Sequence, residues 1–333
     1  KQIEELYRKH PEEARDSFGE DPFEVKNILK YWVLSEKQEF HVIPTDTINI
    51  HIDKDALLRS GIMFPKTIRH LKGEDLKDAI PDKLYIPLTD IRMLTKVDLL
   101  MLEMLANCNW ERPLYLAISV GSVSKLKFDN YFVQEGLAFR FTPFDYKKWG
   151  DVGENRLYAV DVERLYDNVM NRYKYGGLAT PGLYLDETTL RTCWYHRRLF
   201  AQLAKELIAQ GDNERAKKVL AYAEQVIPGY NVPETHESGS YDIATAYATL
   251  GEKTKAVTLA VHLIAEAEDY INWAFSLKGN RIEMVRNDCI YKFWQWNQYN
   301  ELLKKIDGEK YKESNRQFEE KYALFAPTMS YKN

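Results

Sequence analysis

The first half of the chain carries several short strand patterns. In Thr47–Ile52, isoleucines alternate with polar residues, the pattern of a strand with one buried face and one wetter face. Lys83–Leu88 is a second strand candidate, and Pro87 predicts that this strand lies at a sheet edge or ends there. Pro113–Gly121 is a near-continuous apolar run, which favours an interior strand, and Gly136–Phe144 alternates apolar residues again. These segments predict sheet structure before residue 150.

Two helices are expected among these strands. The segment Asp21–Leu34 opens with an aspartate as N-cap and a proline at the first helical position, and Glu24 would complete a capping box. Thr95–Asn107 has apolar residues almost all around the helix axis, which predicts a buried helix, and its first threonine can form a capping box with Asp98. Strands mixed with helices predict an α+β or α/β domain.

From Asp161 onwards the pattern changes to helices alone. Apolar residues in Val162–Tyr173 fall at helical spacing, with Asp161 placed to cap the helix. A second long helix carries its apolar face through Leu190–Leu207, and only helical patterns follow as far as Phe325. The sequence therefore predicts a second, all-α domain.

An internal repeat runs through this helical domain. Leu203–Pro228 aligns with the segment that starts at Ile243, with an offset of 40 residues that brings Gly211 onto Gly251. The small residues and closing proline of the first copy have the spacing of a tetratricopeptide repeat, in which two antiparallel helices pack closely. A third helical pair in Met284–Phe325 is expected to cap the stack.

These patterns divide the 333 residues into three parts. Residues 1–22 are predicted to be a polar linker or lead-in helix, residues 23–150 the mixed α/β domain, and residues 151–333 the tetratricopeptide-like helical domain. Hydrophobic residues make up 45% of the chain and charged residues 29%, which fits folded domains rather than long disorder.

Charge and hydropathy exclude several classes of protein. The 46 basic and 50 acidic residues leave a net charge of −4, so no nucleic-acid partner is expected. The longest uncharged stretch, Pro113–Ser124, is twelve residues long, and a membrane helix needs about 20 apolar ones, so no spanning segment is expected. Since the chain opens at Lys1 with polar residues, we interpret it as an internal piece of a longer protein. Its three cysteines, Cys108, Cys193 and Cys289, are widely spaced and indicate buried thiols rather than disulfides.

The sequence contains none of the common catalytic or nucleotide-binding motifs. One cluster combines residue types that bind metals: His41, Asp46, His51, Asp53 and Asp55. Their spacing matches no known site type, and we interpret them as solvated polar residues. We therefore expect no catalytic residue, no metal site and no cofactor in this chain.

The best candidate binding residues lie on one predicted helix. Arg191, Trp194, Arg197 and Arg198 combine guanidinium groups with an aromatic face, a mixture suited to carboxylates, phosphates or sugars. The alternative is that Trp194 lies in the core and the arginines form salt bridges with acidic neighbours.

A second aromatic group lies near the C-terminus. Phe293, Trp294, Trp296 and Tyr299 could form a platform for a sugar ring. Aromatic residues at helical spacing usually fill a core, so packing between helices is the favoured interpretation.

Four sequence blocks carry a family resemblance. They are LTKVDLLMLEMLANCNWERPLYLAISVG (Leu94–Gly121), YFVQEGLAFRFTP (Tyr131–Pro143), VDVERLYDNVMNRYKYGG (Val160–Gly177) and LYLDETTLRTC (Leu183–Cys193). Together they resemble the extracytoplasmic C-terminal part of a bacterial family of multi-spanning membrane proteins. That family, long classed only as a domain of unknown function, is related to protein O-mannosyltransferases, and the tetratricopeptide-like tail agrees with it.

The resemblance implies a glycosyltransferase-like membrane protein that takes a sugar from a lipid-linked donor. Its catalytic acids would lie in a membrane domain upstream of this chain. The chain itself would then be a soluble, periplasmic (extracytoplasmic) region tethered to the inner membrane. We expect it to be non-catalytic by itself and to bind a protein acceptor, a partner or a glycan.

Two alternatives remain open at this point. One is a self-contained carbohydrate-active hydrolase with a cleft between the two domains, which would need two carboxylates about 5 to 10 Å apart. The other is a structural scaffold that holds the membrane part in an oligomer.

Overall fold

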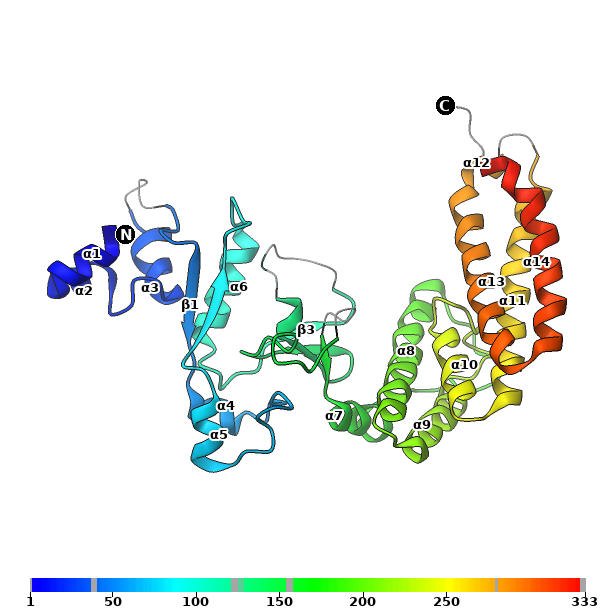
Figure 1. Ribbon diagram of the computed structural model, residues 1–333, viewed down its shortest axis with the longest axis horizontal. Helices are drawn as coiled ribbons and strands as arrows, with labels where there is room; N and C mark the ends of the chain where they lie inside the picture. The colour runs from blue at the N-terminus through cyan, green and yellow to red at the C-terminus, as the bar shows by residue number, and fades with distance from the viewer. Residues whose placement is uncertain are drawn as a thin grey trace. The chain divides into compact units, whose positions relative to one another are not determined.

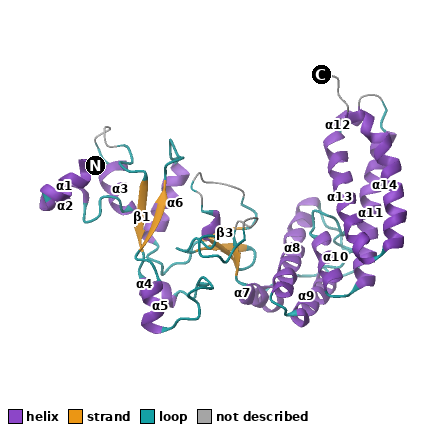
Figure 2. Ribbon diagram, viewed as in Figure 1, coloured by secondary structure: helices purple, strands orange, loops and turns teal. Residues whose placement is uncertain are grey.

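The computed structural model describes residues 2–36, 41–120, 126, 128–153, 158–278 and 281–329. The chain forms two compact units, Lys1–Asp161 and Val162–Asn333. The first unit combines helices with two small sheets, whereas the described part of the second contains helices alone (Figures 1 and 2). The predicted order, an α+β region followed by an all-helical region, is confirmed.

The first sheet of unit 1 is a two-stranded antiparallel ribbon. Strands β1 (Thr47–His51) and β2 (Lys83–Pro87) form where the alternating pattern and the second strand candidate predict them, and they pair with each other. Ile48 and Ile50 are buried in the core, but Asn49 on the opposite face is also buried. The chain at Phe23 and Glu24 lies along the free edge of β1 at this point, and the Phe23 carbonyl oxygen accepts a hydrogen bond from the Asn49 amide (2.9 Å).

The helix predicted from Asp21 begins four residues later. It consists of α3 (Val25–Ile28), which continues as the π-helical turn η1 (Leu29–Val33). Asp21 is not its N-cap: one carboxylate oxygen accepts a hydrogen bond from the Phe23 amide (3.0 Å), and the other from Lys83 Nζ (2.6 Å). An aspartate that bonds the amide two residues ahead forms a turn, so this side chain stabilises a bend instead of a helix end. Upstream, α1 (Gln2–Lys9) and α2 (Pro11–Phe18) occupy the predicted lead-in segment.

Helix α6 (Lys96–Asn107) forms where the apolar run predicts it, and its capping box is confirmed. The Thr95 amide donates to the Asp98 carboxylate (2.7 Å), and the Asp98 amide donates to Thr95 Oγ1 (3.3 Å). The prediction that this helix is buried all round is wrong. Among the described residues of unit 1, α6 packs mainly against α3 and β1, whereas Leu100 and Met104 are 58% and 56% exposed.

The second sheet of unit 1 has four short strands. They lie in the order β3 (Tyr115–Ala117), β5 (Ala138–Phe141), β4 (Phe132–Gln134) and β6 (Ala159–Val160), and only the β4 and β6 pair is parallel. The apolar run Pro113–Gly121 is therefore an edge strand with exposed side chains instead of the predicted interior strand, and Gly121 itself is outside the described residues. The apolar run predicted a buried interior strand, but among the described residues β3 has one neighbouring strand, β5, and Tyr115 and Ala117 are exposed. Two short helices, α4 (Lys54–Arg59) and α5 (Gly73–Ala79), and the turn η3 (Asp129–Tyr131) complete the unit.

Unit 2 consists of helices joined by short turns and by two longer loops, residues 173–186 and 227–239. They are α7 (Val162–Asp167) with the π-turn η4 (Asn168–Arg172), α8 (Glu187–Ala209), α9 (Asn213–Val226), α10 (Ser240–Thr249), α11 (Lys253–Ser276), α12 (Arg281–Met284), α13 (Arg286–Ile306) and α14 (Gly308–Met329). Helices α8 and α9, α10 and α11, and α13 and α14 pack as consecutive pairs (Figure 1). The last pair corresponds to the third pair predicted from the sequence.

The turns of the first two pairs have the same geometry. Gly211 and Gly251 both have φ of 80°, a left-handed conformation that glycine adopts without strain. The amide after each glycine returns to a carbonyl in the preceding helix, Asp212 to Leu207 and Glu252 to Tyr247, at 2.9 Å in both cases. The 40-residue offset found in the sequence is therefore also a structural repeat.

Candidate functional site

Arg197 is buried in the helical unit and holds a loop together. Its guanidinium is 3% exposed and donates to the carbonyl oxygens of Pro233 (2.8 Å), Ile227 (3.1 Å) and Val232 (2.5 Å), and to Ser238 Oγ (3.1 Å). Burial lowers the pKa of this side chain to about 10. The loop between α9 and α10 is thus wrapped around one guanidinium group from α8.

The other three predicted binding residues do not share a site with the Arg197 guanidinium. Arg191 is exposed and pairs with Glu187 one turn earlier on the helix (2.5 Å). Trp194 is half-buried, and among the described residues its indole N–H has no hydrogen-bond partner. Arg198 is exposed and lies over the Tyr195 ring (4.9 Å to the ring centre). The predicted cluster is therefore divided between an inward and an outward face of α8.

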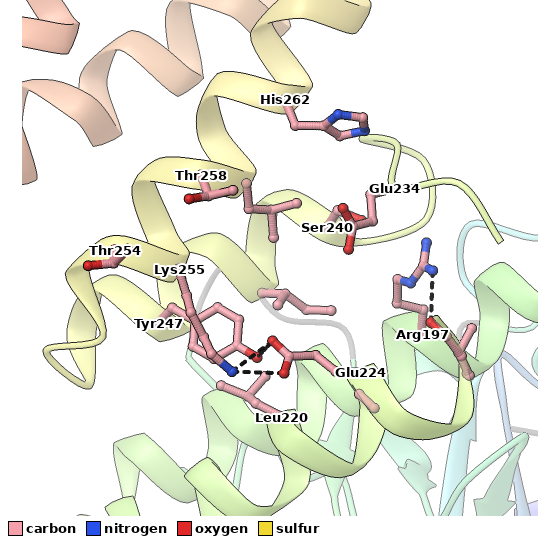
Figure 3. A pocket seen from close by; sticks show the side chains of 14 residues that line it. Arg197, Leu220, Glu224, Glu234, Ser240, Tyr247, Thr254, Lys255, Thr258 and His262 are labelled. Atoms are coloured by element: carbon pink, nitrogen blue, oxygen red, sulfur yellow. Dashed lines mark hydrogen bonds and ion pairs between the residues drawn. The ribbon is translucent and has the colours of Figure 1, made fainter. Parts of the chain in front are cut away.

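A groove of about 350 Å³ lies between helices α9, α10 and α11, next to this loop (Figure 3). Its floor is apolar and mostly buried, formed by Leu220, Ala223, Ile227, Ile243 and Leu259. Its polar lining consists of Arg197, Glu224, Glu234, Ser240, Tyr247, Thr254, Lys255, Thr258 and His262. The groove thus combines an apolar floor with a polar rim.

One end of the groove is closed by an ion pair between neighbouring repeats. Lys255 Nζ on α11 donates to both carboxylate oxygens of Glu224 on α9 (3.0 and 2.8 Å), and Tyr247 Oη donates to the same carboxylate (2.5 Å) (Figure 3). Burial, and then the Glu224 carboxylate, raise the pKa of Tyr247 far above its ordinary value. These contacts fix the width of the groove at this end.

The same arrangement occurs one repeat earlier. Arg215, which is 40 residues before Lys255, pairs with Glu163 on α7 through two hydrogen bonds of 2.8 Å and lies over the Tyr166 ring (5.1 Å). Lys255 likewise lies over the Tyr247 ring (5.0 Å). A basic residue at this repeat position thus pairs with a glutamate and a tyrosine in both repeats.

The other end of the groove is formed by the loop that Arg197 holds. Glu234 and Ser240 lie on that side, and the exposed ring of His262 projects from α11 above them (Figure 3). Gly239, just before α10, permits a close approach of that helix to α8. Its φ is 84°, and a Cβ atom there would lie 2.8 Å from Arg198 Cγ.

Of the four predicted binding residues, Arg197 lines the groove, and the other groove residues were not predicted from the sequence. Glu224, Tyr247 and Lys255 are separate polar residues in three helices, and no motif connects them. The internal repeat could have pointed to Lys255. The alignment places Lys255 on Arg215, so both copies have a basic residue at this position.

Three residues of the metal-like cluster have other partners. Asp53 caps α4 by accepting a hydrogen bond from the Ala56 amide (2.9 Å), Asp55 pairs with Lys77 (2.7 Å), and His41 Nε2 is 2.7 Å from the Ser35 carbonyl oxygen. Among the described residues, no three His, Cys, Asp or Glu side chains are placed to hold a metal ion.

The C-terminal aromatic group is divided between core and surface. Phe293, Trp296 and Tyr299 are buried, as the packing interpretation predicts. Trp294 is 48% exposed and lies outside that core.

The fold defines a two-part protein with an α+β unit and a repetitive helical unit. Within the chain, residues 4–163, just under half of the sequence, match a family model described as TMEM260-associated domain 2. Two blocks of the family resemblance, Leu94–Gly121 and Tyr131–Pro143, lie wholly inside the matched residues. The match supports the relation to a mannosyltransferase-related membrane protein; it covers nearly all of unit 1 and ends two residues into unit 2. A bacterial origin and a tetratricopeptide character of the tail stay predictions.

The comparisons with curated proteins and with solved structures found no match. In the part of the chain that the structure describes, no helix is long and apolar enough to cross a bilayer.

Proposed function

We propose that this chain is an extracytoplasmic accessory region of a glycosyltransferase-like membrane protein, and that its tetratricopeptide-like unit binds a polypeptide segment of a protein acceptor or partner. In this proposal the chain recognises and positions the acceptor or partner, and another part of the protein transfers the sugar. The observation that carries the proposal is the groove between α9, α10 and α11, which has an apolar floor and a polar rim.

The groove has the size and chemistry of a peptide site. Its volume of about 350 Å³ is at the lower end of the range for ligand pockets, roughly 300 to 1,000 Å³, so it can take side chains but not a folded domain. The buried floor residues Ile227 and Leu259 would gain apolar contacts from an inserted side chain. The exposed hydroxyl groups of Thr254 and Thr258 on the polar rim can form hydrogen bonds with the peptide backbone.

Contacts within the chain hold both ends of the groove in the absence of a ligand. Arg197 fixes the loop at one end, and the pair of Glu224 with Lys255 fixes the two helices at the other. A site that is ordered in advance loses less conformational entropy on binding. The architecture therefore favours recognition of an extended segment by a preformed surface.

The proposed role beside a membrane protein rests on unit 1. Its match to a TMEM260-associated domain supports a role beside a membrane protein, and the family resemblance relates that protein to sugar transfer. A peptide site in unit 2 would put acceptor recognition in the same chain as the unit that supports a role beside a membrane protein.

Blocking the groove is expected to abolish peptide binding without unfolding the chain. Thr258 is an exposed residue of the lining, so arginine at this position adds bulk and charge to the groove at little cost to the core. We expect Thr258→Arg to weaken binding of peptides selected from a random display library by at least about tenfold in a fluorescence anisotropy titration.

The matched control is Thr249→Arg. Thr249 is an exposed threonine on α10 that does not line the groove, so peptide binding should stay unchanged. If both variants bind the selected peptides as the wild type does, or if no peptide can be selected, the groove is not the recognition site.

A further inference from the structure

One carboxylate in the groove between α9, α10 and α11 has no partner among the residues that the structure describes. Lys255 and Glu224 form an ion pair at one end of the groove (2.8 Å). At the other end the Arg197 guanidinium donates to Ser238 and to three carbonyl oxygens of the loop before α10. Glu234 is the remaining lining residue that carries a full charge, and within the described ranges its carboxylate forms no hydrogen bond or ion pair.

Packing against the loop positions the Glu234 carboxylate beside the groove (Figure 3). Glu234 is half-buried, and its side chain lies against Gly229, where a Cβ atom would be 3.2 Å from the Glu234 carboxylate carbon. The glycine at position 229 therefore leaves the space that the carboxylate occupies. The Arg197 charge attracts Glu234 from a longer distance, but the two side chains form no ion pair, since the Arg197 nitrogens donate to the loop.

This carboxylate affects which ligands the groove can bind. A ligand that fills the groove removes water from Glu234, and loss of hydration without a new partner strongly disfavours a charged group. A lysine or arginine side chain compensates for this loss through charge-assisted hydrogen bonds, which are stronger than those from neutral donors. An acidic ligand would instead be repelled by Glu234, and the two cations of the lining, Arg197 and Lys255, already have partners.

We propose that the groove selects a polypeptide segment that carries a lysine or arginine near an apolar side chain. The apolar side chain contacts the buried floor, and the basic group pairs with the Glu234 carboxylate. This inference rests on the proposed function and names the chemical class of its ligand. An acidic segment is excluded by the same charge that binds the basic one.

Two peptide display libraries, screened in parallel against the full chain, test this selectivity. One library allows lysine and arginine but no acidic residue, and the other allows aspartate and glutamate but no basic residue. We expect peptides that Thr258→Arg weakens to come from the first library alone. Replacing the lysine or arginine of such a peptide with glutamine should weaken its binding by about tenfold.

Glu234→Gln tests the residue itself, because glutamine keeps the size of the side chain and removes its charge. We expect this variant to bind the basic peptide about tenfold more weakly in a fluorescence anisotropy titration. Glu234→Gln combined with the glutamine-substituted peptide should bind no more weakly than either single change, since both changes remove the same contact. Added salt should weaken binding by the wild type more than binding by Glu234→Gln.

The matched control is Glu214→Gln, since Glu214 is an exposed glutamate of α9 that does not line the groove. This variant should bind the basic peptide as the wild type does. Equal loss of binding in Glu214→Gln and Glu234→Gln would show an effect of overall charge and would overturn the inference.

Two further results separate this inference from the proposed function. Peptides that Thr258→Arg weakens, but that come from the acidic library or bind Glu234→Gln as tightly as the wild type, would overturn the inference and leave the peptide groove standing. If neither library gives a peptide that Thr258→Arg weakens, the groove is not the recognition site, and both proposals are wrong.

Discussion

Replacing Arg197 with methionine is expected to lower the free energy of unfolding of the helical unit by about 3 to 5 kcal/mol. Methionine keeps much of the apolar volume but removes every donor. The carbonyl oxygens of Ile227, Val232 and Pro233 then lose their hydrogen bonds, and those in the buried part of the loop cannot regain them from water. The loop that closes one end of the groove should loosen, so peptide binding should weaken as well.

The effect can be measured by urea unfolding followed through helical circular dichroism, and by hydrogen exchange of the loop amides. Arg198→Met is the matched control, because Arg198 is exposed, its guanidinium lies over the Tyr195 ring, and methionine keeps the Cβ and Cγ atoms that lie beside Gly239. It should change stability by less than about 0.5 kcal/mol. Equal stability of the two variants would show that the Arg197 hydrogen bonds do not hold the loop.

Trp296 should be the most sensitive aromatic residue of α13. It is fully buried, and its indole N–H donates to Ser314 Oγ (2.8 Å), which in turn donates to Asn300 Oδ1 (2.6 Å). Trp296→Ala leaves a large cavity between α13 and α14 and breaks this chain, so we expect a loss of about 3 to 5 kcal/mol in the free energy of unfolding.

Trp296→Phe separates the effect of the lost packing from the effect of the lost hydrogen bond. Phenylalanine fills most of the space but leaves the Ser314 hydroxyl without its donor, so we expect a loss of about 1 to 3 kcal/mol. Trp294→Ala, two residues away on the exposed side of the helix, should be near neutral in the same urea titration. A loss in Trp294→Ala as large as that in Trp296→Ala would contradict the division of these residues into surface and core.

The parts of the fold that follow from local sequence were predictable. The alternation in Thr47–Ile52, the Thr95 and Asp98 capping box and the glycine turns at Gly211 and Gly251 are all encoded within a few residues. These features depend on backbone hydrogen bonds and side-chain direction, which a short segment determines by itself.

The predictions were wrong where contacts with distant segments determine whether a residue is buried or which group it binds. The apolar content of α6 suggested burial on all sides, but burial depends on what packs against each face, and Leu100 remains exposed. Asp21 has the sequence of a helix cap, yet Lys83, which is 62 residues away, binds its carboxylate. Composition alone could not show that β3 lies at a sheet edge.

The same limit applies to the candidate sites. Arg197 was identified as a binding residue from its type and neighbours, but the carbonyls that it holds are 30 to 36 residues further along the chain. The groove joins three helices, and its charged end connects Glu224 with Lys255 across 31 residues. Such sites exist only after the helices pack, so the sequence can suggest the residue types but not the partners.

The central claim is that unit 2 recognises a polypeptide in the groove between α9, α10 and α11. Hydrogen exchange of the full chain, with and without a peptide selected by it, tests this claim most directly. We predict slower exchange with peptide at residues 220–227 and 254–262, and no such protection in Thr258→Arg. Protection confined to other segments, or the same protection in Thr258→Arg, would contradict the claim.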